Sequence, residues 1–346
     1  MDNWDQIGTL TGQCVVFMVG QTRQNLETSA QMESRAMKSS PNYPEVIPRY
    51  AIIKSQKRPL PSGEADFLVK AYPPDILIVE ARYGFKDLDS ESLPDLNETL
   101  FAECRRILDE FDCNPEFDEE YCVYCVSDYK GDPEEILNRY GEKIAGLLKN
   151  ERIPLDEEEV RSTLQSNLKY AKDDLSLVDW DGAFLFDSHA DFEANIELFE
   201  IANLQLLRSR ILDDGLDIRL KTTIELLRRR PERSGVRSRQ VREVLREIVQ
   251  IRTTSLLESQ AIEHNIKLIG DWYTARLYAL ISRKFHLEEW RKNIDEKLDI
   301  LEDVYSMAAD NFSVSFNTTL EFILIAGWFI LQIGWFTLLF LELYYF

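Results

Sequence analysis

A run of twenty residues near the C-terminus constrains this chain more than any other feature. Phe322–Leu341 reads FILIAGWFILQIGWFTLLFL, which contains no charge and has only Gln332 and Thr337 as polar side chains. Twenty helical residues rise about 30 Å, the thickness of the hydrocarbon core of a bilayer. In lipid the backbone must satisfy its own hydrogen bonds, so the run has to be helical there. The sequence therefore predicts one transmembrane helix rather than a core helix, which would ordinarily carry a polar face.

The two ends of the chain indicate how this helix is inserted. Only a few residues follow the apolar run, so we expect insertion after synthesis and a body that stays on the side of synthesis. The N-terminus, MDNWDQ, carries acidic residues where a signal peptide needs basic ones. Five cysteines without a disulfide-like spacing are typical of a reducing compartment. We expect a tail-anchored integral membrane protein with its bulk on the cytoplasmic side of a prokaryotic inner or plasma membrane.

The charge of the chain restricts its partners. Sixty-one Asp and Glu residues oppose 40 Lys and Arg residues, which gives a formal net charge of −21. Such a surface repels phosphates, so nucleic acid is not an expected partner. Hydrophobic residues make up 45% of the chain, enough for folded domains with their own cores.

Residues 1–187 are predicted to form an α+β head domain. Short apolar, β-rich runs alternate there with the helical patterns of Asn97–Phe111 and Pro133–Asn150. The expected strands are Cys14–Val19, Tyr50–Ile53, Phe67–Val69, Ile76–Glu80, Tyr121–Ser127 and Leu177–Phe186. This order predicts a ferredoxin-like α/β sandwich with helices on one face of the sheet.

Residues 188–318 are predicted to form long antiparallel helices, and residues 319–346 the transmembrane anchor. Helices are expected over Asp191–Arg229, over Arg237–Arg283 and from Leu287 onward, with a break at 230–235 that contains Pro231 and Gly235. The third helix shows apolar residues at alternating spacings of four and three, which is the seam of a coiled coil. We expect an oligomer seam made of Ile294, Leu298, Leu301, Tyr305, Ala308 and Phe312.

The helical half resembles the DUF155 family, which includes mitochondrial regulators of meiotic nuclear division and related yeast sporulation proteins. The similar segments, within residues 180–340, are Leu207–Asp217, Ile269–Tyr278, Phe285–Trp290, Lys297–Tyr305 and the pair Leu320-Glu321 that opens the apolar tail. The resemblance implies a membrane-anchored, oligomer-forming scaffold without established chemistry, linked in eukaryotes to organelle translation.

No motif predicts a catalytic, cofactor or metal site. Cys122 and Cys125 have C-x-x-C spacing, but on a strand they point to opposite faces, so we interpret them as core cysteines rather than metal or redox ligands. The acidic run Asp109–Glu120 lacks the glycine of a calcium loop and is interpreted as a solvated loop. No Walker-type or G-x-G-x-x-G sequence is present, so no cofactor is expected.

Two further groups of residues are candidate contact sites. A basic patch at the first helical break could meet lipid headgroups, RNA or an acidic domain, or could be a solvated helix end: Arg228, Arg229, Arg230, Arg233, Arg237 and Arg239. Within the apolar run, Gly327, Gln332 and Gly334 could pack transmembrane helices together.

The sequence favours a membrane-anchored, oligomeric scaffold or sensor without catalytic activity, with a protein partner recruited by the head domain. A first alternative is a membrane effector whose C-terminal helices oligomerise into a pore or perturb the bilayer, as in prokaryotic defence. A second is an enzyme or ligand-binding activity in the N-terminal domain.

Overall fold

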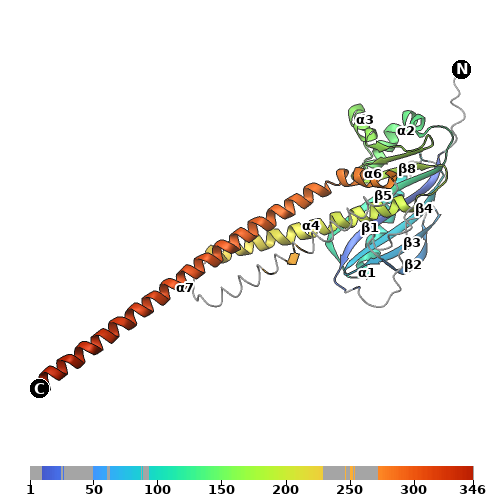
Figure 1. Cartoon of the computed structure of the whole chain (residues 1–346). Helices are drawn as coiled ribbons and strands as arrows, with labels where there is room; N and C mark the ends of the chain where they lie inside the picture. The colour runs from blue at the N-terminus through green and yellow to red at the C-terminus, as the bar shows by residue number, and fades with distance from the viewer. Residues whose placement is uncertain are drawn as a thin grey trace. The chain divides into compact units, whose positions relative to one another are not determined.

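The computed structural model describes most of the chain (Figure 1). The described residues are 10–24, 26, 50–60, 63–86, 88, 93–228, 246, 250–251, 253 and 272–345. They fall into two compact units, each treated by itself below. The first comprises Met1–Leu212 and Leu257–Lys292, and the second Asp213–Leu256 and Asn293–Phe346.

The first unit is built on an eight-stranded sheet of order β2-β3-β4-β1-β5-β8-β7-β6. All neighbouring strands are antiparallel except β5 and β8, which are parallel. The strands are β1 (Thr11–Thr22), β2 (Ala51–Leu60), β3 (Gly63–Tyr72), β4 (Ile76–Phe85), β5 (Cys113–Asp128), β6 (Asn167–Leu168), β7 (Asp174–Val178) and β8 (Gly182–Asp187).

Helices cover both faces of this sheet. The continuous apolar run Cys14–Val19 lies at the centre of the sheet, and its side chains alternate between two separate hydrophobic cores. One core contains α1 (Leu93–Glu110) and α2 (Pro133–Leu148), and the other contains the first part of α4 (Glu193–Arg228) and α6 (Trp272–Lys284). Strands buried on both faces read as unbroken apolar runs, which is the pattern seen here.

The α+β class predicted from the sequence is confirmed, but its helices are arranged differently. The expectation of helices on one face is wrong, because the apolar stripe of α4 packs on the second face. Leu198, Phe199 and Ile201 of α4 are each at most 1% exposed. Burying those side chains on the sheet removes apolar area from water that a solvated helical stalk would leave exposed.

Local sequence signals set the ends of two surface helices. Asp132 and Asp156 precede α2 and α3 (Glu157–Gln165), and each side chain accepts a hydrogen bond from the backbone nitrogen two residues later. Such caps satisfy amide groups that the first turn leaves without partners. Pro133 occupies the first turn of α2, where its missing N–H group costs nothing.

In the second unit, the end of α4 runs beside α7 (Leu287–Tyr345). Asn293 Nδ2 donates to Asp213 Oδ1 at 2.8 Å, and Lys297 Nζ lies 2.7 Å from both Asp213 Oδ1 and Asp217 Oδ1. Residue numbers rise together along both helices, so α4 and α7 run in the same direction here. Most of the expected second helix of the hairpin, from 237 to 271, lies outside the described residues.

Candidate functional site

Three charged side chains meet in the interior of the first unit. Lys70 Nζ lies 2.7 Å from Glu80 Oε2, and 2.7 and 2.8 Å from the two carboxyl oxygens of Glu200. Lys70 is 6% exposed, Glu80 1% and Glu200 0%. Lys70 is on β3, Glu80 on β4 and Glu200 on α4, so these contacts join the helix to the sheet. Burial of each charge is costly, and close pairing offsets that cost.

Arg82 extends the same set of contacts towards the surface. Its Nε donates to Glu80, and its terminal nitrogens pair with both oxygens of Glu193, with Nη2 2.9 Å from Oε2. Arg82 is on β4 and Glu193 is in the first turn of α4, so this bidentate ion pair is a second contact between the helix and the sheet. We call Lys70, Glu80, Arg82, Glu193 and Glu200 the buried charge cluster.

The two buried carboxyl groups of the cluster titrate in opposite directions. Burial raises the pKa of Glu200 to about 8, with the Glu80 charge adding to it and Lys70 opposing it. Burial also acts to raise the pKa of Glu80, but Lys70 and Arg82 outweigh it and lower that pKa to about 2. Burial lowers the pKa of Lys70, yet Glu200 and Glu80 more than reverse this effect, so Lys70 stays charged.

A cavity of about 490 Å³ lies beside the buried charge cluster. Glu80, Arg82 and Glu193 form part of its wall, and the remainder is Ser55, Gln56, Lys57, Asp66, Phe67 and Leu68. Lys57 pairs with Asp66 at 3.2 Å, so the outer wall is made of exposed residues of both signs. The cavity therefore offers polar contacts without a dominant charge.

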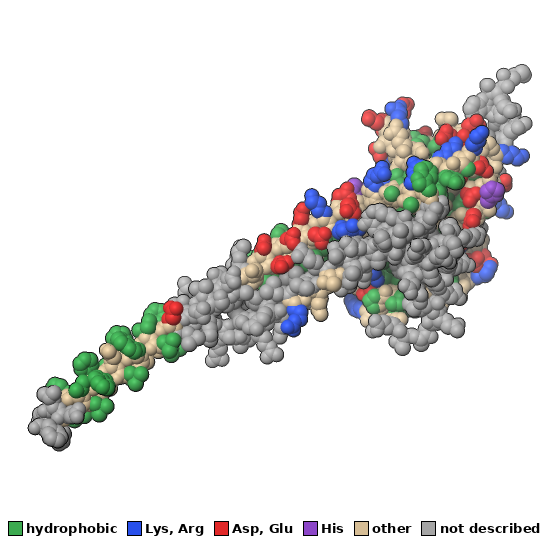
Figure 2. Space-filling view, viewed as in Figure 1, with side chains coloured by type: hydrophobic (Ala, Val, Ile, Leu, Met, Phe, Trp, Pro, Cys, Tyr) green, Lys and Arg blue, Asp and Glu red, His purple; other side chains and the backbone are tan. Residues whose placement is uncertain are grey.

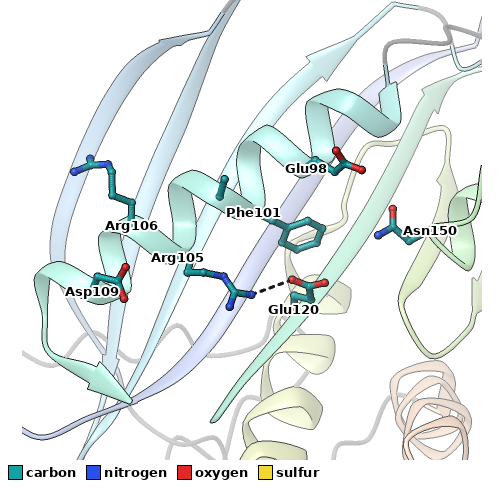
Figure 3. A pocket seen from close by; sticks show the side chains of 8 residues that line it. Glu98, Phe101, Arg105, Arg106, Asp109, Glu120 and Asn150 are labelled. Carbon is teal, nitrogen blue, oxygen red and sulfur yellow. Dashed lines mark ion pairs between the residues drawn. The ribbon is translucent and has the colours of Figure 1, made fainter. Parts of the chain in front are cut away.

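A second cavity, of about 380 Å³, lies between the outer face of α1 and β5 (Figure 3). Arg105 crosses it to Asp118 at 2.9 Å and Glu120 at 3.6 Å, and Arg106 is held by Glu103 and Glu110. Both arginines thus already have carboxylate partners from this chain. The arrangement is a surface network of ion pairs, and such pairs contribute little individually.

The acidic run Asp109–Glu120 is not the solvated loop expected from the sequence. From Cys113 onward it belongs to β5, where it pairs with β1. Its acidic side chains form ion pairs: Asp118 and Glu120 with Arg105, and Glu119 with Arg210. Arg105 and Arg210 belong to α1 and α4, so the charges of the run are paired between different elements, which its local pattern does not show.

The cysteines behave as core residues. Cys122 and Cys125 lie in the cores on opposite faces of the sheet, as the strand alternation predicts. Cys122 Sγ lies 3.3 Å from Cys14 Sγ, and Cys14 donates to Asn97 Oδ1 at 3.2 Å. The contact with Cys122, together with burial, raises the pKa of the Cys14 thiol well above its usual value. Within the described ranges, no three His, Cys, Asp or Glu side chains are grouped as metal ligands.

A known protein family matches the N-terminal part of the chain. The family described as "Uncharacterized protein MJ0711, N-terminal domain" matches residues 12–193. The chain belongs to the MJ0711 N-terminal domain family. The uncharacterized protein MJ0711 of Methanocaldococcus jannaschii is 28% identical over 317 residues, which cover 92% of this chain and 94% of the relative. No solved structure matches the chain significantly.

The resemblance to the DUF155 family is wrong, because the match is to the MJ0711 N-terminal domain family. The segments that carried that resemblance contain helical spacings of three or four, such as Leu207 to Arg210, Tyr273 to Arg276 and Leu301 to Tyr305. This spacing follows from the helical period and recurs in unrelated amphipathic helices. Helical periodicity alone therefore does not identify a family.

The MJ0711 N-terminal domain family match includes most of the buried charge cluster. Lys70, Glu80, Arg82 and Glu193 lie within residues 12–193, whereas Glu200 lies seven residues beyond the match. Sequence reasoning missed these residues. The available signal was a lone charge inside each apolar run, FLVK for Lys70 and ILIVE for Glu80, because a strand buried on both faces places such charges in the core.

Four residues of the predicted oligomer seam are buried within one chain. Ile294 is 3% exposed, Leu298 and Leu301 0%, and Tyr305 8%. These four residues are packed inside the second unit, where α4 runs beside α7, and a contact of the seam with a neighbouring subunit stays a prediction. The side chains of Ala308 and Phe312 lie outside the described set.

The basic patch cannot be placed. Arg228 is the last residue of α4, and its side chain is outside the described set. Arg229, Arg230, Arg233, Arg237 and Arg239 also lie outside the described residues. The contact suggested for this patch remains a prediction.

The C-terminal part of α7 carries the largest exposed apolar surface in the described chain. Glu321–Leu341 is helical, has a mean hydropathy of 2.0 and is not buried by any other part of the chain. Figure 2 shows hydrophobic side chains along the visible face of this segment. Gly327 and Gly334 have no neighbouring atom within 4 Å of an added Cβ, and so their faces are open. This is the one described helix long and apolar enough to cross a membrane.

Proposed function

We propose that this protein is a membrane-anchored, oligomeric scaffold or sensor without catalytic activity. Residues Glu321–Leu341 span the bilayer, and the α+β unit recruits a protein partner. The observation that carries this proposal is the fully exposed apolar segment of α7. An apolar surface of that size is unstable in water and is typical of lipid contact.

The α+β unit lies on the cytoplasmic side of the membrane in this proposal. All five cysteines, including Cys14 and Cys122 at 3.3 Å, carry free thiols, which is the usual state in a reducing compartment. We propose no catalytic role, because the buried charges pair with one another. Lys70, Glu80 and Arg82 all have ion-pair partners within the chain.

Truncation after Thr318 tests the anchor. We expect the full chain to stay with membranes after alkaline carbonate washing, and the truncated chain to move to the soluble fraction, because the hydrophobic segment is lost. The measurement is the share of protein in each fraction by immunoblot. The substitution Leu331→Ile keeps the hydrophobicity and serves as the control that remains in the membrane. A truncated chain that stays with washed membranes would contradict the proposed anchor.

Self-association of the spans tests the oligomer. Gly327 and Gly334 are seven residues apart and share a helix face, which permits close approach of a second helix. Gln332 lies on another face of the helix, about 140° from Gly327, and places an amide in hydrocarbon, where a second Gln332 can bond to it. We expect Gln332→Leu to weaken association in lipid by about 0.6–2 kcal/mol, the range for interhelical hydrogen bonds. The measurement is energy transfer between labelled chains in vesicles, with Leu331→Ile as the control.

The outcome also separates the scaffold from the membrane effector. Vesicles that hold a trapped dye should stay sealed when the full-length protein is incorporated as a scaffold. Dye release that Gln332→Leu abolishes would instead favour a pore. Equal association of the parent chain and Gln332→Leu would count against the role of this amide.

A further inference from the structure

The buried charge cluster contains one more carboxyl group than it has cations. Arg82 lies between Glu80 and Glu193, so Glu200 depends on Lys70, which it shares with Glu80. Two carboxylates that share one ammonium in a low-dielectric interior repel each other, and a proton on one of them relieves that repulsion. Glu80 has two cationic partners and Glu200 has one, so Glu200 is the group that gains more from being neutral.

We propose that α4 docks on the sheet together with one proton taken up from solvent, which the carboxyl group of Glu200 holds. Docking places Glu200 against Lys70 and Glu80, and undocking returns the proton to water as Glu200 becomes solvated. The contact between α4 and the sheet is thus a proton-linked latch. It tightens when protons are abundant and loosens when the surroundings become alkaline.

The groups that surround Glu200 reinforce this linkage. They are Lys70 and Tyr72 on β3, Glu80 and Arg82 on β4, Tyr50 beside β2, and Glu193 and Glu197 on α4. Burial, with the carboxyl groups of Glu200 and Glu197, raises the pKa of Tyr72 well above its usual value, so Tyr72 stays neutral while Glu200 titrates. Lys70 and Arg82 stay cationic over the same range because carboxylates hold their pKa values high.

The pH dependence of docking follows from the carboxyl group of Glu200. The pKa of Glu200 rises from 4.5 to about 8 on docking, so docking binds a proton between those values and weakens about tenfold per pH unit as the pH rises through them. The pKa of Glu80 is held low by Lys70 and Arg82, which are on the sheet and stay beside it when α4 undocks, so Glu80 adds little to the pH dependence of docking. Docking therefore loosens steadily as the pH rises across neutral values, through Glu200.

Infrared spectroscopy of the full chain in lipid vesicles tests where the proton is. We expect the C=O stretch of a protonated carboxyl group at about pH 6.5, with loss of the band as the pH rises through about 8. Glu200→Gln should remove that band, whereas Glu116→Gln, a change at an exposed position on β5, should leave it. Absence of a carboxyl band that titrates between neutral and alkaline pH, or its survival in Glu200→Gln, would overturn the proposal.

Hydrogen exchange measured by mass spectrometry tests the latch itself. After correction for the intrinsic pH dependence of exchange, protection of residues 193–207 should fall about tenfold per pH unit up to about pH 8 in the parent chain. Glu200→Gln should make that protection independent of pH, because the amide is neutral throughout. Protection that stays constant in the parent chain would refute the latch even if Glu200→Gln failed to fold. Neither readout depends on the membrane anchor, so the result is separate from the fractionation experiment.

Discussion

Lys70→Met should lower the free energy of unfolding by about 3–5 kcal/mol, the cost of leaving buried charges without their partner. The methionine side chain has a similar length but no ammonium group, so Glu80 and Glu200 would face each other across an apolar group. Both carboxyl groups are almost fully buried. The measurement is urea unfolding in detergent micelles, followed by tyrosine and tryptophan fluorescence.

The matched control for this experiment is Lys57→Met on the neighbouring strand. Lys57 forms ion pairs with Glu64 and Asp66, but its side chain is 65% exposed, so we expect almost no change. Glu200→Gln added to Lys70→Met should recover part of the lost stability, because Glu80 keeps Arg82 as a partner and Glu200 is the carboxyl group that Lys70→Met leaves uncompensated. A loss below about 1 kcal/mol for Lys70→Met would mean that the interior is far better solvated than the exposed fractions indicate.

Phe199→Ala should cost about 3–5 kcal/mol of stability, the range for removing a buried aromatic ring. Phe199 is on α4, is 0% exposed and stacks on Tyr121 of β5 with ring centroids 5.3 Å apart. Tyr121 in turn meets Phe285 edge-on at 5.4 Å, and its hydroxyl group donates to the carbonyl oxygen of Asp179 at 3.0 Å. Loss of the ring would leave a cavity in the core that joins α4 to the sheet.

Phe199→Leu is the control, because it keeps most of the volume and should cost less than about 1.5 kcal/mol. Ile218→Ala offers a second comparison on the same helix, since Ile218 is 56% exposed and should be tolerated. The same urea unfolding measurement serves for all three variants. Equal losses for Phe199→Ala and Ile218→Ala would show that α4 is not packed on the sheet as described.

Apolar runs located the strands but not their lengths. Five predicted runs fall within or overlap β1 to β5, and the sixth, Leu177–Phe186, spans β7 and β8. The strands extend further because polar residues outside the apolar runs can still pair backbone groups. In β5, Asp118 and Glu119 continue the ladder opposite Gly20 and Val19, with Arg105 of α1 and Arg210 of α4 beside them. Hydrophobicity reports burial, whereas a strand needs only a neighbour that supplies hydrogen bonds.

In the helical half, the sequence indicates which helix face is buried but not what covers it. The seam residues Ile294, Leu298 and Leu301 were identified correctly as a buried face, because their spacing fits the helical period. The spacing does not say what covers that face, because a helix inside the same chain and a helix of another subunit bury the same stripe equally well. Periodicity specifies that a face is covered and leaves open what covers it.

The sequence by itself determined the α+β class, the positions of the central strands and the apolar segment at the end of α7, because each depends on the composition or period of one continuous stretch. The tertiary structure decided which helices cover each face of the sheet and which charges become buried. Glu80 and Glu200 are 10 and 130 positions from Lys70 along the chain, yet both lie within 2.8 Å of its ammonium group. A charged residue in an apolar run can be buried only when an oppositely charged side chain lies beside it. Folding brings that side chain there from elsewhere in the sequence.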